Sequence, residues 1–232
     1  MTGGQLVARV LRQAGVGHVF TLCGGHILPI YDGCLDEGIA VIDVRHEQAA
    51  AHAADAYARL TRNVGVAMVA PGPGVTDAVT GVANAYAARS PMLLIGGAAP
   101  LGLRGLGALQ EMEQVALLRP ITKASLTVTE TRQIPEVLTT AIRTALSGRP
   151  GPVFVEIPVD LLLATIEDRL APIPTAYVHR PRAAADAEAL GTLEGLLAGA
   201  ERPVVMAGGV CTGTTRRRRW PPSPSAPACP SS

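Results

Sequence analysis

The segment Arg45-His46-Glu47-Gln48 opens an alanine-rich helical stretch, and the turn Pro71-Gly72-Pro73-Gly74 follows the next apolar run along the chain. The two segments put one carboxylate beside one glycine-rich turn. Glycine lets another molecule approach the backbone closely, because it has no Cβ. A glutamate delivered into such a crevice suits a site where a heteroaromatic nitrogen must receive a proton.

Apolar runs alternate with segments of helical periodicity on both sides of this stretch, which is the pattern of a parallel sheet with helices on both faces. The predicted class is therefore α/β: a doubly wound, mostly parallel sheet, followed by the start of a second α/β domain. Gly38 and Gly148 are expected to take left-handed conformations just past helix ends. A long loop containing residues 102–110 is expected before the last helix. The predicted strands are 18–22, 40–43, 65–69, 92–95 and 152–157, and the predicted helices are 4–14, 27–37, 47–61, 76–88 and 135–147.

Proline and a change of composition suggest where the first domain ends. Prolines at 172, 174 and 181 interrupt the helical pattern, as in a linker. A helix at 184–198 and a buried strand at 202–207 are expected after it. The final segment runs through four arginines into a proline- and serine-rich end with no apolar periodicity, so we expect disorder there. Its abrupt start favours a frameshifted or truncated end over an evolved arm. The predicted divisions are 1–165 (first domain), 166–183 (linker), 184–210 (start of a truncated central domain) and 211–232 (disordered tail).

Composition excludes several classes of protein. The 232 residues carry a net charge of +1 and 48 % hydrophobic residues, which is typical of a soluble globular protein and gives no general attraction to nucleic acid or acidic membranes. The apolar runs are far shorter than the ~20 residues that cross a bilayer, and no secretory leader opens the chain. Four cysteines without a C-x-x-C pair indicate free thiols in a reducing compartment. We expect a cytoplasmic protein.

Seven short stretches within residues 24–160 resemble the pyrimidine-binding domain of thiamine-diphosphate enzymes, in the acetolactate synthase and 2-hydroxyacyl-CoA lyase group. They occur in the order that this group has. The resemblance implies the thiamine-diphosphate-binding fold of that family. The stretches are Gly24 to Pro29 (GGHILP), Arg45 to Gln48 (RHEQ), Ala54 to Arg59 (ADAYAR), Gly72 to Gly74 (GPG), Gly105 to Glu111 (GLGALQE), Arg119 to Lys123 (RPITK) and Gly148 to Val153 (GRPGPV).

The resemblance also implies a catalytic pair. Glu47 would hydrogen-bond the pyrimidine nitrogen of the cofactor and activate it, and Gln110 would lie near the cofactor and guide the substrate. Leu109 replaces the phenylalanine that usually precedes this glutamine, which leaves the acyl specificity open. On position alone, Glu47 could equally be an acid that caps a helix N-terminus.

The cofactor-binding residues implied by the resemblance are glycines and their neighbours. Gly24 and Gly25 would face the reacting ring and the substrate, although a glycine pair is also an ordinary turn. Gly72, Pro73 and Gly74 would pack against the aminopyrimidine, with Pro71 in place of the usual serine. Gly72 and Gly74 could otherwise be half of a dinucleotide fingerprint, but Asp77 stands where the third glycine should be.

Five further residues have weaker assignments. Asn84 is predicted either to line the pocket or to lie exposed on its helix. Arg149 matches a position associated with flavin, and otherwise ends a helix. His26 lies where a substrate-facing residue would be, but a lone histidine is more often structural. Arg119 and Lys123 are predicted as surface cations.

The implied cofactors are thiamine diphosphate and Mg²⁺, with FAD left open. The family holds the diphosphate and Mg²⁺ on a separate domain with a Gly-Asp-Gly motif, which this sequence lacks, so no residue is assigned as a metal ligand. Because this chain would supply only the pyrimidine-binding half of the cofactor site, the resemblance implies a homo-oligomer or association with a full-length subunit. The leading hypothesis is the N-terminal part of an acetolactate-synthase-like enzyme that decarboxylates a 2-oxo acid and transfers the acyl carbanion. The alternatives are a 2-hydroxyacyl-CoA lyase and a non-catalytic fragment, with a Rossmann dehydrogenase as a distant third.

Overall fold

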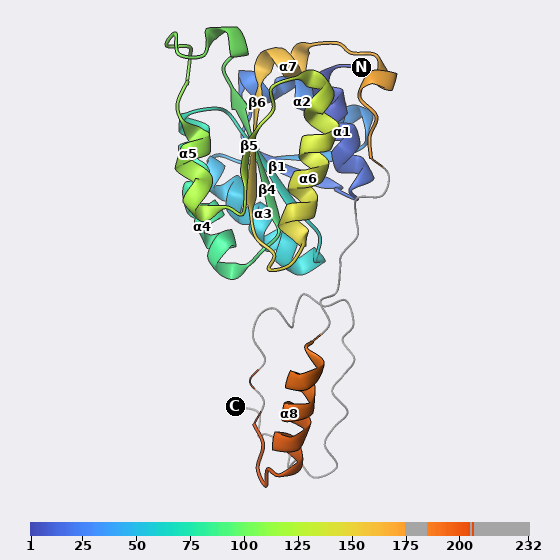
Figure 1. Cartoon of the computed structure of the whole chain (residues 1–232). Coiled ribbons are helices and arrows are strands. Elements are labelled where there is room, and N and C mark those ends of the chain that lie inside the picture. The colour runs from blue at the N-terminus through green and yellow to red at the C-terminus, as the bar shows by residue number, and fades with distance from the viewer. Residues whose placement is uncertain (175–184, 205, 207–232) are drawn as a thin grey trace.

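One parallel sheet forms the centre of the protein, as the computed structural model shows for residues 1–174, 185–204 and 206 (Figure 1). The strand order is β2-β1-β3-β4-β6-β5, and every neighbouring pair is parallel. This confirms the predicted α/β class. Strands β3, β4 and β6 are buried along their whole length, so they appear as continuous apolar runs in the sequence. The strands are β1 (His18–Thr21), β2 (Ala40–Asp43), β3 (Gly65–Val69), β4 (Met92–Ala98), β5 (Ser125–Thr127) and β6 (Val153–Pro158).

Helices cover both faces of the sheet, as predicted. Successive strand residues point to opposite faces, so Val66 and Met68 belong to the core beneath α1, α2 and α6, whereas Ala67 and Val69 belong to the core beneath α3, α4 and α5. Figure 1 shows α6 and α1 on one side of the strands and α4 and α5 on the other. The helices are α1 (Gly3–Gln13), α2 (Leu28–Asp36), α3 (Glu47–Thr61), α4 (Pro73–Ala88), α5 (Gln114–Leu118), α6 (Ile134–Leu146) and α7 (Val159–Leu163).

Small residues bring α3 and α4 close together. A Cβ on Gly81 of α4 would lie only 2.4 Å from the Cβ of Ala51 on α3, so the two helices pack almost backbone to backbone there. Their N-terminal ends follow β2 and β3, at the carboxyl edge of the sheet. Ligands of open α/β sheets bind at this edge. The close packing therefore places Glu47 beside the turn 71–74.

Three parts of the predicted secondary structure need correction. Helix α4 starts at Pro73 rather than 76, and β4 continues through Gly96 and Gly97 to Ala98. The segment predicted as a long loop contains α5 and the edge strand β5. These two elements are five and three residues long, which is too short for periodicity to reveal them. The predicted left-handed glycines are confirmed, with φ of +65° at Gly38 and +56° at Gly148.

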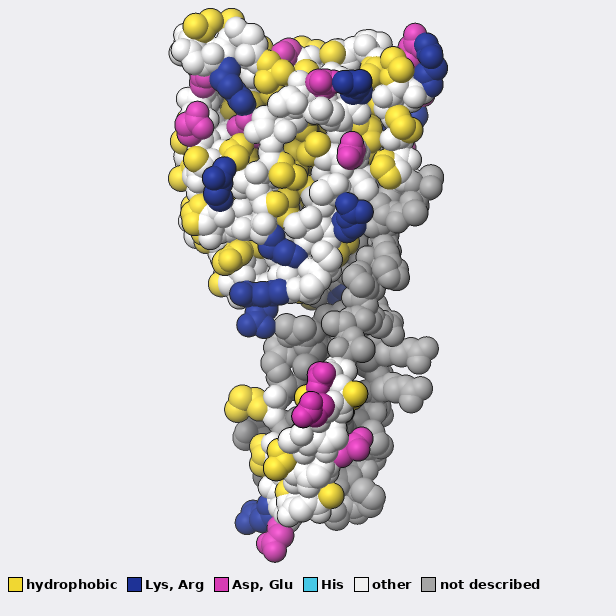
Figure 2. Space-filling view, in the orientation of Figure 1, with side chains coloured by type: hydrophobic (Ala, Val, Ile, Leu, Met, Phe, Trp, Pro, Cys, Tyr) yellow, Lys and Arg dark blue, Asp and Glu magenta, His cyan; other side chains and the backbone are white. Residues whose placement is uncertain are grey.

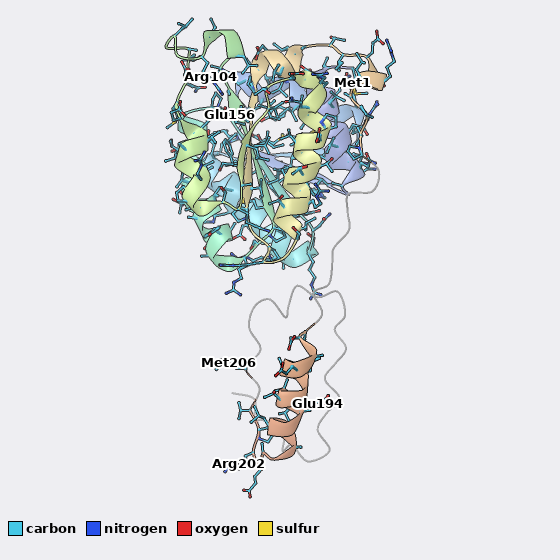
Figure 3. All side chains as sticks on the ribbon, viewed as in Figure 1. Met1, Arg104, Glu156, Glu194, Arg202 and Met206 are labelled. Atoms are coloured by element: carbon cyan, nitrogen blue, oxygen red, sulfur yellow. The ribbon has the colours of Figure 1, made fainter. Side chains whose placement is uncertain are left out.

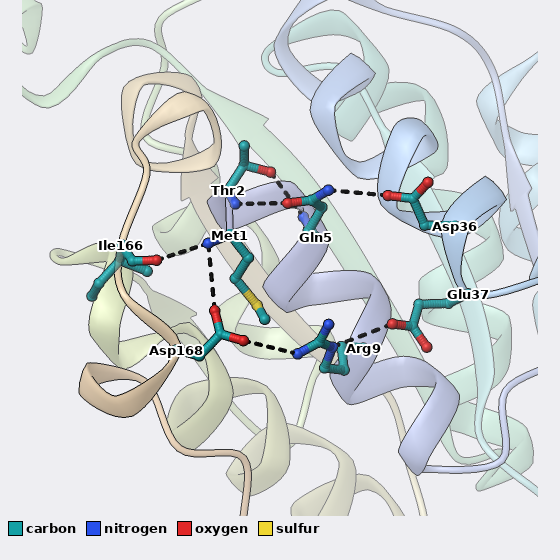
Figure 4. A network of polar contacts seen from close by, with 8 residues as sticks. All are labelled: Met1, Thr2, Gln5, Arg9, Asp36, Glu37, Ile166 and Asp168. Carbon is teal, nitrogen blue, oxygen red and sulfur yellow. Dashed lines mark hydrogen bonds and ion pairs between the residues drawn. The ribbon is translucent and has the colours of Figure 1, made fainter.

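The beginning of the predicted linker packs against α1 (Figure 4). Arg9 lies between Glu37 of the α2 end and Asp168, at 3.3 and 3.5 Å. Thr2 pairs with Thr165 in an isolated antiparallel bridge, and Ala171 is buried. Residues 166–171 therefore pack on the first domain and belong to it structurally, although they lie within the predicted linker.

Beyond the linker, α8 (Ala187–Ala198) confirms the helix predicted at 184–198. Each of its residues is exposed. The strand predicted at 202–207 does not form in its described part, since residues 202–204 are irregular and Val204 is 93 % exposed. The rest of that strand and the tail predicted at 211–232 lie outside the described residues. No helix in the described ranges is both long and apolar enough to cross a bilayer.

Candidate active site

A cavity of about 450 Å³ opens at the carboxyl edge of the sheet. Its walls come from the turn after β1, the start of α3, the end of β3, the loop after β4, and α7. The structure thus brings together four of the predicted site residues, Gly24, Gly25, Glu47 and Gln110, which are far apart in the sequence. The lining residues are Cys23, Gly24, Gly25, His26, Glu47, Ala70, Leu109, Gln110 and Val159.

Glu47 is the carboxylate of this cavity. Helix α3 starts beside it because His46 is extended and its Nδ1 accepts the N–H of Gln48 at 3.2 Å, which caps the helix. The half-buried side chain of Glu47 lies against the backbone of Gly74, where an added Cβ would be 3.2 Å from Oε1. Within residues 1–174, no group donates a hydrogen bond to the Glu47 carboxylate in the structure. Its acceptor atoms are therefore open to a ligand.

The turn 71–74 supports the cavity from behind. Gly72 adopts φ +60° and ψ −109°, and a Cβ there would lie 2.6 Å from the carbonyl oxygen of Gln110, so only glycine fits. Pro73 is exposed at the first turn of α4. None of Gly72, Pro73 and Gly74 is itself among the lining residues. The turn acts by holding Glu47 and Gln110, which are.

The turn after β1 forms another part of the wall. A Cβ on Gly24 would meet the Cβ of Ala70 at 2.7 Å, whereas a Cβ on Gly25 would meet no atom within 4 Å. Gly25 therefore presents bare backbone to open space, which a planar ring can approach. His26 lies beside it, and burial lowers the pKa of its imidazole. A neutral imidazole both donates and accepts hydrogen bonds near neutral pH.

The loop after β4, residues 99–113, carries Gln110 into the cavity at φ +61°, a left-handed conformation that is uncommon for a non-glycine residue. Glu111 accepts the backbone N–H of Gly105 and, at 3.1 Å, that of Ala108. These bonds, the Gly105 bond first, hold the pKa of Glu111 below its usual value. The loop is thus folded on itself through its own carboxylate.

A second contact ties the same loop to the sheet. Arg104 pairs with Glu156 of β6, whose side chain is buried, and Thr127 donates to the same carboxylate at 3.2 Å (Figure 3). The outer side of the loop is apolar, and Figure 2 shows apolar side chains at the corner where the loop lies in Figure 1. Leu109, which replaces the expected aromatic ring, is both a lining residue and 75 % exposed. The other exposed apolar side chains of the loop are Leu103, Leu106 and Met112.

Two predicted contacts are not brought to the cavity. The Asn84 amide donates to Asp55 at 2.7 Å, in a cluster with Arg59 between α3 and α4, so it does not line the cavity. Arg149 lies just before β6, at the amino edge of the sheet, with its guanidinium 5.7 Å from the ring centre of Tyr86. That is the edge opposite the cavity. Arg149 therefore does not line this cavity, and its association with flavin stays a prediction.

The two cations of the stretch 119–123 have different surroundings: Lys123 bonds the backbone, whereas Arg119 is exposed. Lys123 donates to the carbonyl oxygens of Thr144 and Ser147, the latter at 2.7 Å, and so binds the C-terminal end of α6. Burial lowers the pKa of Lys123. Arg119 is exposed. Lys123 is thus a partly buried cation that is held by backbone carbonyls.

Sequence reasoning missed Gln114, the first residue of α5. Its side chain is 1 % exposed and bonds the backbone at two points, accepting the N–H of Gly72 at 3.2 Å and donating to the carbonyl of Gly97 at 2.7 Å. It also missed the Arg104–Glu156 pair. A buried glutamate inside an otherwise apolar strand was the one signal that could have identified the pair.

One group of metal-binding residue types lies at the cavity mouth, among the residues that the structure describes. The ligand atoms of His46, Glu47 and Asp77 are within 4.8 Å of one another. However, Nδ1 of His46 accepts the Gln48 N–H, so the neutral ring carries its proton on Nε2, which faces Asp77 at 3.8 Å. That nitrogen then has no lone pair for a metal. The group fits a capping histidine with a nearby acid better than it fits Mg²⁺, which prefers oxygen ligands.

Comparison with known proteins places this site in context. Residues 1–117 match the family described as thiamine pyrophosphate enzyme, N-terminal TPP binding domain. The chain is 53 % identical to 2-hydroxyacyl-CoA lyase 2 of Mus musculus over 173 residues, which are 75 % of this chain and 27 % of that protein. It is 39 % identical to a probable acetolactate synthase of Mycobacterium bovis over 209 residues, which are 90 % of this chain and 38 % of that protein. The chain thus spans between a quarter and two fifths of these relatives.

Proposed function

Because the chain belongs to the thiamine pyrophosphate enzymes, we propose that its cavity binds the pyrimidine ring of thiamine diphosphate and forms one side of an active site. Thiamine diphosphate and thiamine pyrophosphate are two names for the same cofactor. The observation that carries this proposal is the position of Glu47. Its carboxylate lines the cavity, packs on Gly74, and receives no hydrogen bond from the described part of the chain. A ligand nitrogen that carries a proton would supply the missing donor.

The cavity fits the group in size and shape. About 450 Å³ is within the range of small-molecule sites. Gly25 exposes backbone at the cavity, and the turn 71–74 supports Glu47 and Gln110 through glycines that pack against them. Wall segments without side chains suit the close approach of a flat heteroaromatic ring. The neighbouring domain that would hold the diphosphate and Mg²⁺ is a proposed partner, supplied by another part of the enzyme or another subunit.

Thiamine diphosphate, when bound, supplies a carbon nucleophile for reactions at carbonyl groups. Glu47 would hold or release a proton at the pyrimidine nitrogen of the cofactor. Gln110 offers an amide donor and acceptor at the inner end of the loop. His26, whose imidazole pKa is lowered by burial, offers a further donor or acceptor in the turn after β1. Leu109 adds an apolar side chain to the same wall as Gln110.

For the substrate, we propose a 2-hydroxyacyl-CoA, cleaved at a carbon–carbon bond. The higher identity to the lyase relative supports this choice over the acetolactate synthase branch. The second candidate, decarboxylation of a 2-oxo acid with transfer of its acyl group, is supported by the longer match to the synthase relative.

Calorimetric titration of thiamine diphosphate with Mg²⁺ into the chain tests the cofactor proposal. We expect saturable binding that Glu47→Gln weakens at least about tenfold, since the amide can no longer accept in the same way and carries no charge. Glu136→Gln is the matched control, because Glu136 also stands in the first turn of a helix, α6, away from the cavity. Absence of wild-type binding, or equal binding by Glu47→Gln, would contradict the proposal.

Product analysis separates the two substrates. The segment of this chain that matches the mouse lyase can replace its counterpart in that protein, and the chimera can be offered a 2-hydroxyacyl-CoA or pyruvate. Cleavage of the thioester substrate with no acetolactate from pyruvate supports the lyase. Acetolactate formation would favour the second candidate instead.

A further inference from the structure

The side chain of Gln114 joins the carboxyl ends of the two central strands, β3 and β4. Gly97, whose carbonyl it bonds at 2.7 Å, belongs to the end of β4, and Gly72, whose N–H it accepts at 3.2 Å, follows β3. The side chain is 1 % exposed. Both ends of its amide are therefore used, and no water competes for them.

Each of these two glycines packs against a residue of the cavity wall. Gly97 lies against His26, since a Cβ there would be 2.8 Å from the His26 Cβ. Gly72 lies against Gln110, since a Cβ there would be 2.6 Å from the Gln110 carbonyl oxygen. Gly74, in the same turn as Gly72, packs on Glu47. One buried amide thus lies behind all three polar side chains of the cavity without touching any of them.

We propose that Gln114 is a positioning residue, which sets Glu47, Gln110 and His26 at their working separation by fixing the backbone of Gly72 relative to that of Gly97. This inference rests on the function proposed above. The left-handed backbone of Gln110 makes the arrangement necessary, because a non-glycine residue keeps that conformation only where its surroundings hold it. Gly72 supplies that support on one side, and α5 with Gln114 follows Gln110 closely on the other.

The chemistry at position 114 requires one donor and one acceptor. A methionine has the same length but offers neither, so the Gly72 N–H and the Gly97 carbonyl would lose their partner. A glutamate keeps the acceptor for Gly72, but its ionised form faces the Gly97 carbonyl with a second acceptor. Its protonated form donates there and restores both bonds. Substitution by glutamate therefore makes the position sensitive to pH.

The test compares Gln114→Met and Gln114→Glu with the wild-type chain between about pH 5 and pH 8. Two quantities are measured: the affinity for thiamine diphosphate with Mg²⁺, and the backbone amide resonances of Gly72, Glu47 and Gln110 in ¹⁵N-labelled protein. We expect Gln114→Met to bind about tenfold more weakly at every pH, with all three resonances shifted. Gln114→Glu should show the same defects at about pH 8 and return toward wild type as the pH falls.

Gln133→Glu and Gln133→Met are the matched controls, since Gln133 accepts a hydrogen bond from Thr129 at the start of α6, away from the cavity. If Gln114→Met fails to fold, the pH series of Gln114→Glu decides, because its neutral form is an isostere of the native amide. Shifts confined to residues next to position 114, or a Gln114→Glu profile that does not change with pH relative to wild type, would overturn the inference. If wild type binds no cofactor, the proposed function fails, while the resonances of Glu47 and Gln110 still decide the role of Gln114.

Discussion

Glu47 and Gly74 are in contact across the gap between α3 and α4, with Oε1 of the glutamate 3.2 Å from where a Cβ on the glycine would stand. The same added atom would lie 3.3 Å from the Cβ of Ala70. Both distances are shorter than ordinary van der Waals contact. A methyl group at position 74 would therefore require the Glu47 carboxylate or Ala70 to shift by a few tenths of an ångström.

Substitution of Gly74 by alanine should displace the Glu47 carboxylate. We expect Gly74→Ala to weaken binding of thiamine diphosphate by about tenfold while costing about 1–2 kcal/mol of stability or less, because the glutamate end can move aside. Calorimetry and chemical denaturation measure the two effects. Gly17→Ala is the control, since a Cβ at Gly17 meets no atom within 4 Å. Unchanged affinity in Gly74→Ala would mean that the position of Glu47 is not important for binding.

Local pattern was sufficient to predict most of the framework and part of the site. The buried strand at 65–69 is an uninterrupted apolar run, the strand at 153–158 is apolar apart from Glu156, and Glu47 follows a capping residue at the start of a periodic helix. These features are encoded within a few neighbouring residues. The convergence of Gly25, Glu47 and Gln110 followed from parallel topology and the family resemblance.

The parts that were missed depend on partners far along the chain. The proposed role of Gln114 depends on its hydrogen bonds to Gly72 and Gly97, and the position of Arg104 depends on its ion pair with Glu156. Neither pairing produces a periodic pattern in the neighbouring sequence. For Asn84, the predicted alternative of an exposed position on its helix is confirmed, because the packing of α4 on α3 directs its amide to Asp55 and not to the cavity.

Asn84 should contribute to stability and not to cofactor binding. In Asn84→Ala the Asp55 carboxylate loses one donor but keeps Arg59, whose Nε lies 2.8 Å away. We expect a loss of about 1 kcal/mol in the free energy of unfolding and no change in affinity for thiamine diphosphate. Denaturation and calorimetry on the same preparation provide the check. A clear loss of affinity for thiamine diphosphate with unchanged stability would instead indicate that Asn84 contributes to cofactor binding.

The Arg104–Glu156 pair should stabilise the loop because its carboxylate is buried. Glu156 is 3 % exposed, whereas the Arg104 side chain is 47 % exposed. Arg104→Met leaves a buried charge with Thr127 as its remaining hydrogen-bond partner, which should cost about 1–3 kcal/mol. Adding Glu156→Gln should recover part of that loss, since the buried charge is removed.

Arg132→Met is the comparison for that pair, because Arg132 and Glu130 form an ion pair that is exposed on both sides. Its expected effect is about 0–1 kcal/mol. All variants are measured by chemical denaturation under the same conditions. Equal losses for Arg104→Met and Arg132→Met would show that burial of Glu156 does not strengthen the first pair.

Two cysteines of the first domain should differ sharply in reactivity. Cys34 is fully buried on α2, and burial raises the pKa of its thiol to about 12, so almost no thiolate forms near pH 8. Cys23 is exposed and lines the cavity beside Gly24. Brief treatment of the folded chain with iodoacetamide should therefore alkylate Cys23 and spare Cys34, as peptide mass spectrometry can show.

The adduct on Cys23 would occupy part of the cavity and weaken binding of thiamine diphosphate. The Cys23→Ser variant should bind the cofactor normally and resist this inactivation. Alkylation of Cys34 in the folded chain as fast as in denaturant would contradict the packing of α2 against the sheet.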